Sequence, residues 1–390
     1  MTFTTEEYAR RHGLVRDELK ARGYDALISY STPKLQANVR WIGRYYVRFA
    51  GMQTRPDGTY AMFGSVSCLF PAEGEPKLVS DQPWDIVRAR QESLFEILGT
   101  EDLGLDLAKE IRAGGYKRVA IDNMYVFPAA HYLTLQRECP NVEFVAENFM
   151  SQLRRVKSAE EIAILRHAET IAEAAVKAGL DAVQVGVTEY EVALIAEQVM
   201  REQGDIETAA SIIASGGVNT ATASSLPSRE KRMEKGELFL LDLAPRWQGY
   251  PGDISRMRVA GDLSDVDPLH RRAHDVSVLM NEEVRKAIKP GVRPVELHDL
   301  ALQVARDAGM GEYREEVDLL GHGLEMDIHG MPDYYWDPTE LRAGEVITVE
   351  PGLIIPGVLG TRIEDVVLVT EDGSETLSVS TPRTLTGEAE

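Results

Sequence analysis

Apolar positions in the first part of the chain switch between the spacing of strands and the spacing of helices. Short, continuous apolar runs are typical of buried strands, whereas apolar positions three and four residues apart are typical of helices that bury one face. The predicted strands are Asp25–Ser31, Val66–Pro71, Pro76–Ser80, Lys117–Asp122 and Val142–Ala146. The predicted helices are Thr5–Arg22, Arg88–Leu98, Leu105–Ala113 and Ala129–Cys139. Strands that alternate with helices indicate an α/β domain.

The second part of the chain opens with two helix-start signals. Ser158 followed by Glu161, and Thr188 followed by Glu191, have the spacing of a capping box. In this motif the two side chains satisfy backbone N–H groups that the first helical turn leaves free. We therefore expect one helix from Ser158 to about Gly179 and another that begins at Thr188.

The length of the chain and an internal sequence repeat indicate how it is divided into domains. The 390 residues are enough for two domains with full cores, and we place the first at residues 1–152 and the second at residues 153–390. Within the second domain, the stretch Gly186–Gly204 recurs in modified form as Gly291–Gly309. A duplicated helix–sheet unit explains this match, and chance similarity of two amphipathic helices is the alternative.

Composition narrows the class of protein. Hydrophobic residues make up 44% and charged residues 27% of the chain, which is ordinary for a soluble globular protein. The net charge of −21 argues against nucleic-acid or anionic-membrane partners, which require basic patches. The cysteines, Cys68 and Cys139, suit a reducing compartment, and no apolar run approaches the roughly 18 residues of a membrane span. Since the N-terminus lacks a signal-peptide pattern, we expect a cytoplasmic protein.

A carboxylate interrupts one of the apolar runs of the second domain. Phe239–Leu243 is apolar except for Asp242, and Gln248–Gly252 predicts a turn or bulge before Asp253. A buried carboxylate is tolerated only when it is paired, hydrogen-bonded or bound to metal. Two such carboxylates on neighbouring strands would converge on one point. The alternative is a pair of solvated loop acids.

Histidines and glutamates downstream strengthen the first of these interpretations. The segment GHGLEMDIHG contains His322 and His329, Glu350 ends the predicted strand in VITVEPG, and Glu364 lies in a second predicted strand, GTRIEDVVLV. Carboxylates with imidazole suit Mn, Fe(II), Co or Zn in a two-metal centre better than a thiolate site. Such a centre activates water as a nucleophile. For either histidine alone, a packing or surface role is the alternative.

The order and context of these residues resemble those of the pita-bread metallopeptidases. This family includes methionine aminopeptidase, aminopeptidase P and prolidase, with creatinase as a non-peptidase relative. The resemblance implies a creatinase-like α/β first domain and a pita-bread second domain with internal pseudo-symmetry. It also implies two divalent metal ions, with Mn as the first expectation and Fe, Co or Zn as alternatives. The ligands that it implies are Asp242, Asp253, His322, Glu350 and Glu364.

The resemblance also implies roles around the metal. His329 matches the family's substrate-contacting histidine, and we expect it to hydrogen-bond the substrate or to stabilise a developing oxyanion. Glu350 is the expected proton shuttle. Arg362 matches the arginine of a G-x-R-x-E-D motif and is expected to orient a metal-bound carboxylate or a substrate anion.

One position departs from the peptidases of this family. Where they carry a histidine that polarises the scissile carbonyl, this chain has Ser224, and no histidine lies between His167 and His270. We therefore expect a hydrolase that cleaves a C–N bond in a small non-peptide substrate, such as an amide, an amidino compound, an ectoine-like ring or an aryl amine. The alternatives are an Xaa-Pro dipeptidase proper and a lyase similar to the pita-bread enzymes that cleave dimethylsulfoniopropionate. A binding module without catalysis is disfavoured by the complete ligand set.

The stretch Asn38–Gln53 is both aromatic and basic. It predicts either a strand whose cationic side chains lie on aromatic rings or a segment that closes over a substrate pocket. In creatinase-like and prolidase-like dimers, the N-terminal domain of one subunit approaches the active site of the other. The resemblance therefore implies a homodimer in which Trp41, Tyr45 and Arg48 contact the substrate.

Overall fold

The chain divides into two compact units. The computed structural model describes residues 3–54, 56, 58, 60–222, 226–313, 320–335 and 337–388. The units are Met1–Arg154 and Arg155–Glu390, so the division falls after Arg154 rather than after Gln152. Helix α6 (Phe149–Arg155) spans this division. Among the residues described, no helix is long and apolar enough to cross a membrane.

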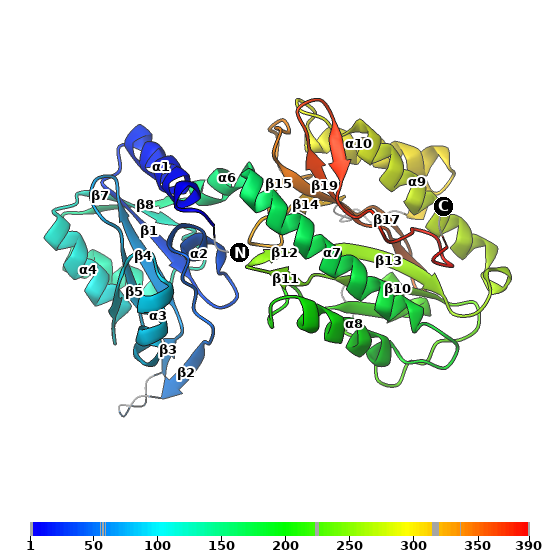
Figure 1. Ribbon diagram of the computed structural model, residues 1–390. Helices are drawn as coiled ribbons and strands as arrows, with labels where there is room; N and C mark the ends of the chain where they lie inside the picture. Colours follow the sequence, from blue (N-terminus) through cyan, green and yellow to red (C-terminus); the bar gives the residue numbers. More distant parts are fainter. Residues whose placement is uncertain are drawn as a thin grey trace. The chain divides into compact units, whose positions relative to one another are not determined.

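The first unit is built on a six-stranded sheet (Figure 1). Its helices are α1 (Thr5–Arg22), α2 (Ala37–Gly43), α3 (Ile86–Glu92), α4 (Leu103–Gly114), α5 (Ala129–Glu138) and the short η1 (Pro83–Asp85). The strands of the sheet are β1 (Ala26–Ser31), β4 (Val66–Pro71), β5 (Lys77–Ser80), β6 (Glu96–Gly99), β7 (Arg118–Asp122) and β8 (Glu143–Glu147). They lie in the order β6-β5-β4-β1-β7-β8, and a separate pair is formed by β2 (Gly51–Thr54) and β3 (Tyr60–Phe63). This mixture of strands and helices confirms the predicted α/β organisation.

For the first unit, one prediction is wrong and one of two alternatives is excluded. The predicted helix Arg88–Leu98 ends at Glu92, and the chain then enters β6, which pairs in parallel with β5. Ser93 already has extended backbone, so the tertiary pairing of a strand overrides the helical pattern at this point. The stretch Asn38–Gln53 is not a single strand, because it begins in α2 and turns at Arg44, whose φ is 66°.

The described residues of the second unit form four long helices and several small sheets. Its helices are α7 (Ala159–Asp181), α8 (Glu189–Gln203), α9 (Pro268–Ala287), α10 (Pro294–Asp307) and the short η2 (Gly217–Ala221), η3 (Leu263–Asp265) and η4 (Gly311–Tyr313). The strands of its first half are β9 (Ile213–Gly216), β10 (Leu238–Leu243), β11 (Arg246–Trp247), β12 (Tyr250–Pro251) and β13 (Ile254–Val259). Those of its second half are β14 (His322–Gly323), β15 (Gly330–Asp333), β16 (Val346–Val349), β17 (Gly352–Ile355), β18 (Leu359–Arg362), β19 (Asp365–Val369) and β20 (Ser374–Thr376).

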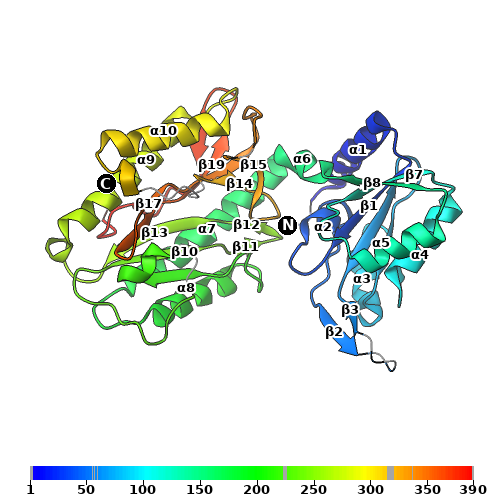
Figure 2. The same cartoon turned by 180° about the vertical axis from the view of Figure 1, so that it is seen from behind.

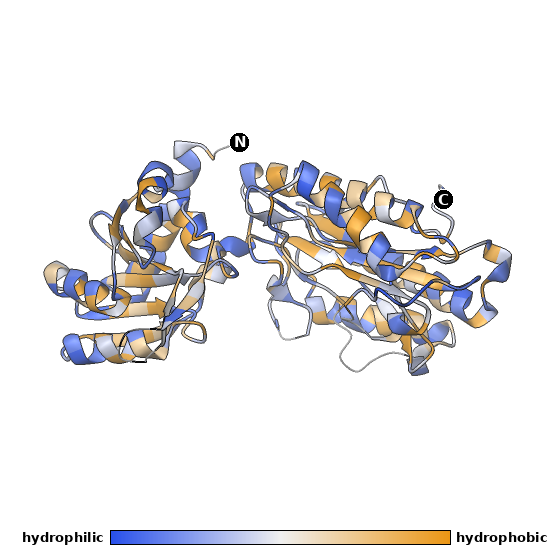
Figure 3. Ribbon diagram, turned by 90° about the horizontal axis from the view of Figure 1, so that it is seen from below, coloured by the Kyte–Doolittle hydropathy of each residue, from blue (hydrophilic) through white to orange (hydrophobic). Residues whose placement is uncertain are grey.

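The two halves of the second unit have the same plan. Helices α7 and α8 pack on each other and α7 lies against β10 and β13, while α9 and α10 pack on each other and α9 lies against β16 to β18. The main sheets have the orders β13-β10-β9 and β15-β14-β16-β19-β20. Figure 2 shows these strands between the helices. Figure 3, coloured by hydropathy, shows hydrophobic positions in orange on many of the strands. The capping boxes predicted at Ser158 and Thr188 are both present at the starts of α7 and α8.

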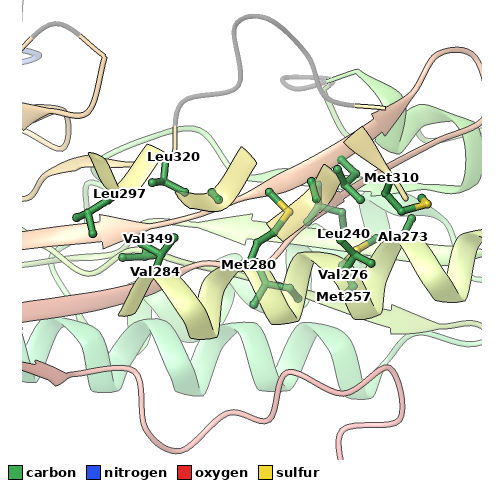
Figure 4. Packing of buried hydrophobic residues seen from close by; sticks show 14 of the residues in the cluster. Leu240, Met257, Ala273, Val276, Met280, Val284, Leu297, Met310, Leu320 and Val349 are labelled. Carbon is green, nitrogen blue, oxygen red and sulfur yellow. The ribbon is translucent and has the colours of Figure 1, made fainter. Parts of the chain in front are cut away.

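The core between α9 and the strands follows from the spacing of apolar residues on that helix. Val276, Met280 and Val284 recur every four positions, so they lie on one face of α9. Figure 4 shows these side chains packed beside Met257 and Val349, which come from strands of the two different halves. This core therefore joins the two halves of the unit directly behind the strands that carry the candidate ligands.

Truncation of Met280 tests this description of the core. Met280 is 3% exposed, so Met280→Ala should lower the free energy of unfolding by about 2–5 kcal/mol, measured by urea denaturation. The neighbouring residue Leu279 is 42% exposed, and Leu279→Ala should change this free energy by only about 0.5 kcal/mol. Equal effects of the two substitutions would contradict the assignment of this helix face to the core.

Candidate metal centre

A two-residue hairpin turn places the first two acidic residues. β11 and β12 pair across Gln248 and Gly249, both with positive φ, as in hairpin turns that match the twist of the strands. The chain then reaches Asp253 and enters β13, which pairs antiparallel with β10 so that Asp242 lies opposite Ser255. The turn predicted for Gln248–Gly252 is therefore confirmed.

The remaining acidic residues and His322 come from the second half of the unit. His322 begins β14, and Glu350 directly follows β16. Val349 pairs with Asp365, so Glu350 and Glu364 are the next residues on the two paired strands. Glu364 was predicted inside a strand, but it lies between β18 and β19 and forms an isolated bridge with Ser255. This bridge connects the ligand-bearing strands of the two halves.

Three of the other four predicted ligands lie around His322. Asp253, His322 and Glu364 each offer one ligand atom, and these atoms lie within 4.8 Å of one another. The Nε2 atom of His322 is 3.3 Å from Oε1 of Glu350 and 3.7 Å from Oδ2 of Asp253. All four side chains are buried or mostly buried.

Arg362 connects the fifth predicted ligand to this cluster. Its Nη1 atom is 2.5 Å from Oδ2 of Asp242, and its Nε atom is 3.9 Å from Oε2 of Glu350. Arg362 therefore contacts two of the predicted ligands, as expected of a residue that orients a carboxylate. The structure thus brings all five predicted ligands and Arg362 together.

Burial and mutual repulsion perturb the acids of this cluster. Burial, and then the charges of neighbouring carboxylates, raise the pKa of Asp253 and of Glu364 well above the ordinary range. Burial also raises the pKa of Asp242, although Arg362 opposes this effect. For Glu350, the upward effect of burial is outweighed by His322 and Arg362, which leaves its pKa lowered. This concentration of buried negative charge, with an imidazole beside it, fits a divalent cation.

Two hydroxyl groups that the sequence analysis did not single out hold the acids in place. Ser255 donates a hydrogen bond to Oε2 of Glu364 at 2.7 Å. Thr348 donates to Oε1 of Glu350 at 3.1 Å and accepts from the backbone N–H of His322 at 3.0 Å. Both lie two residues from a predicted ligand on an extended segment, a spacing that puts side chains on the same face. That spacing was the available signal for them.

The predicted substrate residues have different surroundings. The His329 ring is exposed, and its centroid lies 4.5 Å from that of His322, so a substrate can reach it beside the cluster. Ser224 lies outside the described residues, which omit 223–225. Because neither placement tests a contact with substrate, both roles stay predictions.

Trp41 and Tyr45 belong to the core of the first unit. Arg11 donates a hydrogen bond to the Trp41 carbonyl at 2.9 Å and lies over its ring, while the Tyr45 hydroxyl donates to Asp85 at 3.1 Å. Both rings are fully buried, so a substrate cannot reach them, and the expectation that they contact it is corrected accordingly. Arg48 is exposed, and its Nη2 atom lies 3.5 Å from Oε1 of Glu92. Its contact with the substrate stays a prediction.

Comparison with known proteins assigns the chain to a family. Residues 163–371, which include all the predicted ligands, match the metallopeptidase family M24. The chain belongs to the metallopeptidase family M24. As a member of M24 it is a metal-dependent hydrolase with the two-domain pita-bread architecture, which confirms the family and fold expected from the order of the ligands.

Individual M24 relatives match over most of the chain. The chain is 31% identical over 340 residues to the Xaa-Pro dipeptidase of Pyrococcus furiosus, covering 86% of this chain and 90% of the relative. It is 32% identical to the Xaa-Pro dipeptidase of Lactobacillus delbrueckii subsp. lactis, covering 71% and 75% of the two chains. Among solved structures, the prolidase of Pyrococcus horikoshii OT3 matches with 27% identity and a TM-score of 0.82, covering 96% and 99%.

Replacing Asp253 tests the metal assignment. After removal of metal with a chelator and reconstitution with Mn(II), elemental analysis of the wild-type protein should approach about two ions per chain. Asp253→Asn should bind fewer, because it removes a charge and an oxygen donor from the centre of the cluster. Glu371→Gln, at an exposed position, should keep the wild-type value. Equal metal content in Asp253→Asn and in the wild type would contradict the assignment.

Proposed function

We propose that this M24 hydrolase is an Xaa-Pro dipeptidase that works with two divalent metal ions, Mn(II) being the first expectation. The observation that carries the proposal is the convergence of acids and His322 from both halves of the unit. The dipeptidase named among its relatives covers 86% of this chain and supports the substrate class. The ligands that we propose are Asp242, Asp253, His322, Glu350 and Glu364.

The comparisons do not support the non-peptide substrate expected from Ser224. The relatives that match most of the chain are named as dipeptidases, whereas the earlier expectation depended mainly on one position. A lyase or a module without catalysis gains no support from them either. A homodimer and a cytoplasmic location stay predictions from the sequence.

The residues of the centre suit peptide hydrolysis. When bound, the metal ions lower the pKa of water and polarise the carbonyl of the substrate. Glu350, whose pKa is lowered by His322 and Arg362 despite its burial, is ionised and accepts the proton of the attacking water. It then gives this proton to the proline nitrogen as the C–N bond breaks, which releases the free amino acid and proline.

Two further residues support this reaction from the sides of the centre. Arg362 holds Asp242 through the 2.5 Å contact, so it fixes one carboxylate while Glu350 moves the proton. His329, exposed beside His322, donates a hydrogen bond to the substrate carbonyl oxygen as negative charge develops there.

A substrate comparison tests the proposed function. Protein loaded with Mn(II) should hydrolyse Ala-Pro faster than Ala-Ala, and faster than simple amides or aryl amines, as measured by release of the free amino acid or amine. Glu350→Gln should lower kcat by about 10²–10⁴-fold, because a glutamine cannot carry the proton. Preferential hydrolysis of an amide or aryl amine by the wild type would contradict the proposal.

Ser224 gives a second arm of this experiment. One missing oxyanion donor typically costs about 10²–10³ in turnover, and a serine hydroxyl is shorter than an imidazole. Ser224→His should therefore raise kcat for Ala-Pro, whereas Ser225→His, which introduces the same side chain one position along, should not. A fall in kcat for Ser224→His would indicate a pocket that is built for a different substrate.

A further inference from the structure

Helix α7 carries a buried glutamate that bonds to the backbone of a proposed ligand. Oε2 of Glu169 accepts a hydrogen bond from the N–H of Asp253 at 3.0 Å. Gly252 permits this contact, because a Cβ atom there would come within 2.4 Å of the Ala168 carbonyl oxygen. Glu169 has no exposed surface, so it depends on such partners.

The other oxygen of Glu169 leads to a second proposed ligand. Ser378 donates to Oε1 of Glu169 at 2.6 Å and accepts from the backbone N–H of Val366 at 2.8 Å. Val366 follows Glu364 by two residues on the same extended segment. Glu169 is thus bonded directly to the segment of Asp253 and, through Ser378, to the segment of Glu364.

These two ligands are the pair that the two halves of the unit must bring together. Asp253 and Glu364 belong to the group whose ligand atoms lie within 4.8 Å. The backbone bridge between Ser255 and Glu364 joins the segment of Asp253 to the segment of Glu364. The Ser255 hydroxyl also donates a hydrogen bond to the Glu364 carboxylate. The Glu169–Ser378 contact joins the same two segments from the helix side.

We propose that Glu169 and Ser378 form a positioning pair that fixes Asp253 relative to Glu364 and so sets the affinity of the centre for divalent metal. The inference rests on the proposed metal centre. Partners that orient metal ligands from outside typically change metal affinity by about 10–100-fold when they are removed. Glu169 acts here through the backbone of a ligand, and so it is not itself a catalytic residue.

Glu173, one turn further along α7, shows what a purely structural glutamate does. It is buried as Glu169 is, and it accepts hydrogen bonds from the backbone N–H groups of Ser380 and Thr381. These contacts attach α7 to the C-terminal segment. None of its recorded contacts within the described residues is with a ligand-bearing strand, which makes Glu173 a matched control.

The test compares leucine and glutamine at these positions. Glu169→Leu removes both hydrogen bonds at similar volume, and the Mn(II) dissociation constant should rise by about 10–100-fold, measured calorimetrically on chelator-treated protein. Glu169→Gln should keep wild-type affinity, since its amide oxygen accepts from Asp253 and its amide N–H donates to Ser378. Glu173→Leu should lower the melting temperature of the metal-free protein and leave the dissociation constant unchanged.

Other outcomes separate this inference from the proposed function. If the wild type bound no Mn(II), the metal centre itself would be wrong. If the wild type bound Mn(II) and Glu169→Leu bound it equally well, only the positioning role would be overturned. If Glu169→Leu failed to fold, Ser378→Ala would decide, because it removes the hydroxyl that links Glu169 to Val366 and leaves the hydrogen bond between Glu169 and Asp253 in place. Weaker Mn(II) binding by Ser378→Ala would support the inference, and unchanged binding would refute it.

Discussion

Repulsion between carboxylates held out of water is the constraint on which the second unit depends. Asp253 and Glu364 are buried beside Glu350 and Asp242, and their pKa values are raised by burial and by neighbouring carboxylates. Carboxyl groups stay this close only when rigid elements hold them and a proton or a cation offsets their charge. Antiparallel pairing supplies the rigidity, and the helix layers add to it. On α9, Asn281 donates to the backbone carbonyls that precede Glu350 and Glu364, at 2.9 and 3.3 Å.

This constraint explains which parts of the site the sequence could predict. Asp242 stands out because a buried carboxylate in an apolar run needs a partner. The acids and His322 further along the chain, in their order, indicate that this partner is a metal ion. The supporting residues carry no such local signal. Ser378 is 209 positions from Glu169, and Ser255 is 109 positions from Glu364, so only the folded chain brings them together. For the fold, alternating strands and helices predicted the α/β first unit, but a short strand paired with β5 was mistaken for the end of a helix.

The substrate side was less predictable than the metal side, for a physical reason. Metal coordination restricts residue type, order and spacing, whereas a substrate pocket is made of residues that serve equally well in a core. Trp41 illustrates the difficulty, because an aromatic ring among arginines suggests a binding surface, yet Arg11 covers it inside the first unit. Ser224 illustrates the opposite difficulty. This one altered position suggested a non-peptide substrate, although the chain resembles an Xaa-Pro dipeptidase over 86% of its length.

Anomalous X-ray diffraction at the manganese absorption edge, from crystals of Mn(II)-loaded protein, tests the central claim most directly. The claim is that acids from the two halves of the second unit, with His322, form one divalent metal centre. The predicted result is a pair of anomalous peaks about 3.5–4 Å apart. They should lie within coordination distance of Asp242, Asp253, His322, Glu350 and Glu364. Well-ordered crystals with no peak among these side chains, or with peaks only elsewhere, would contradict the account.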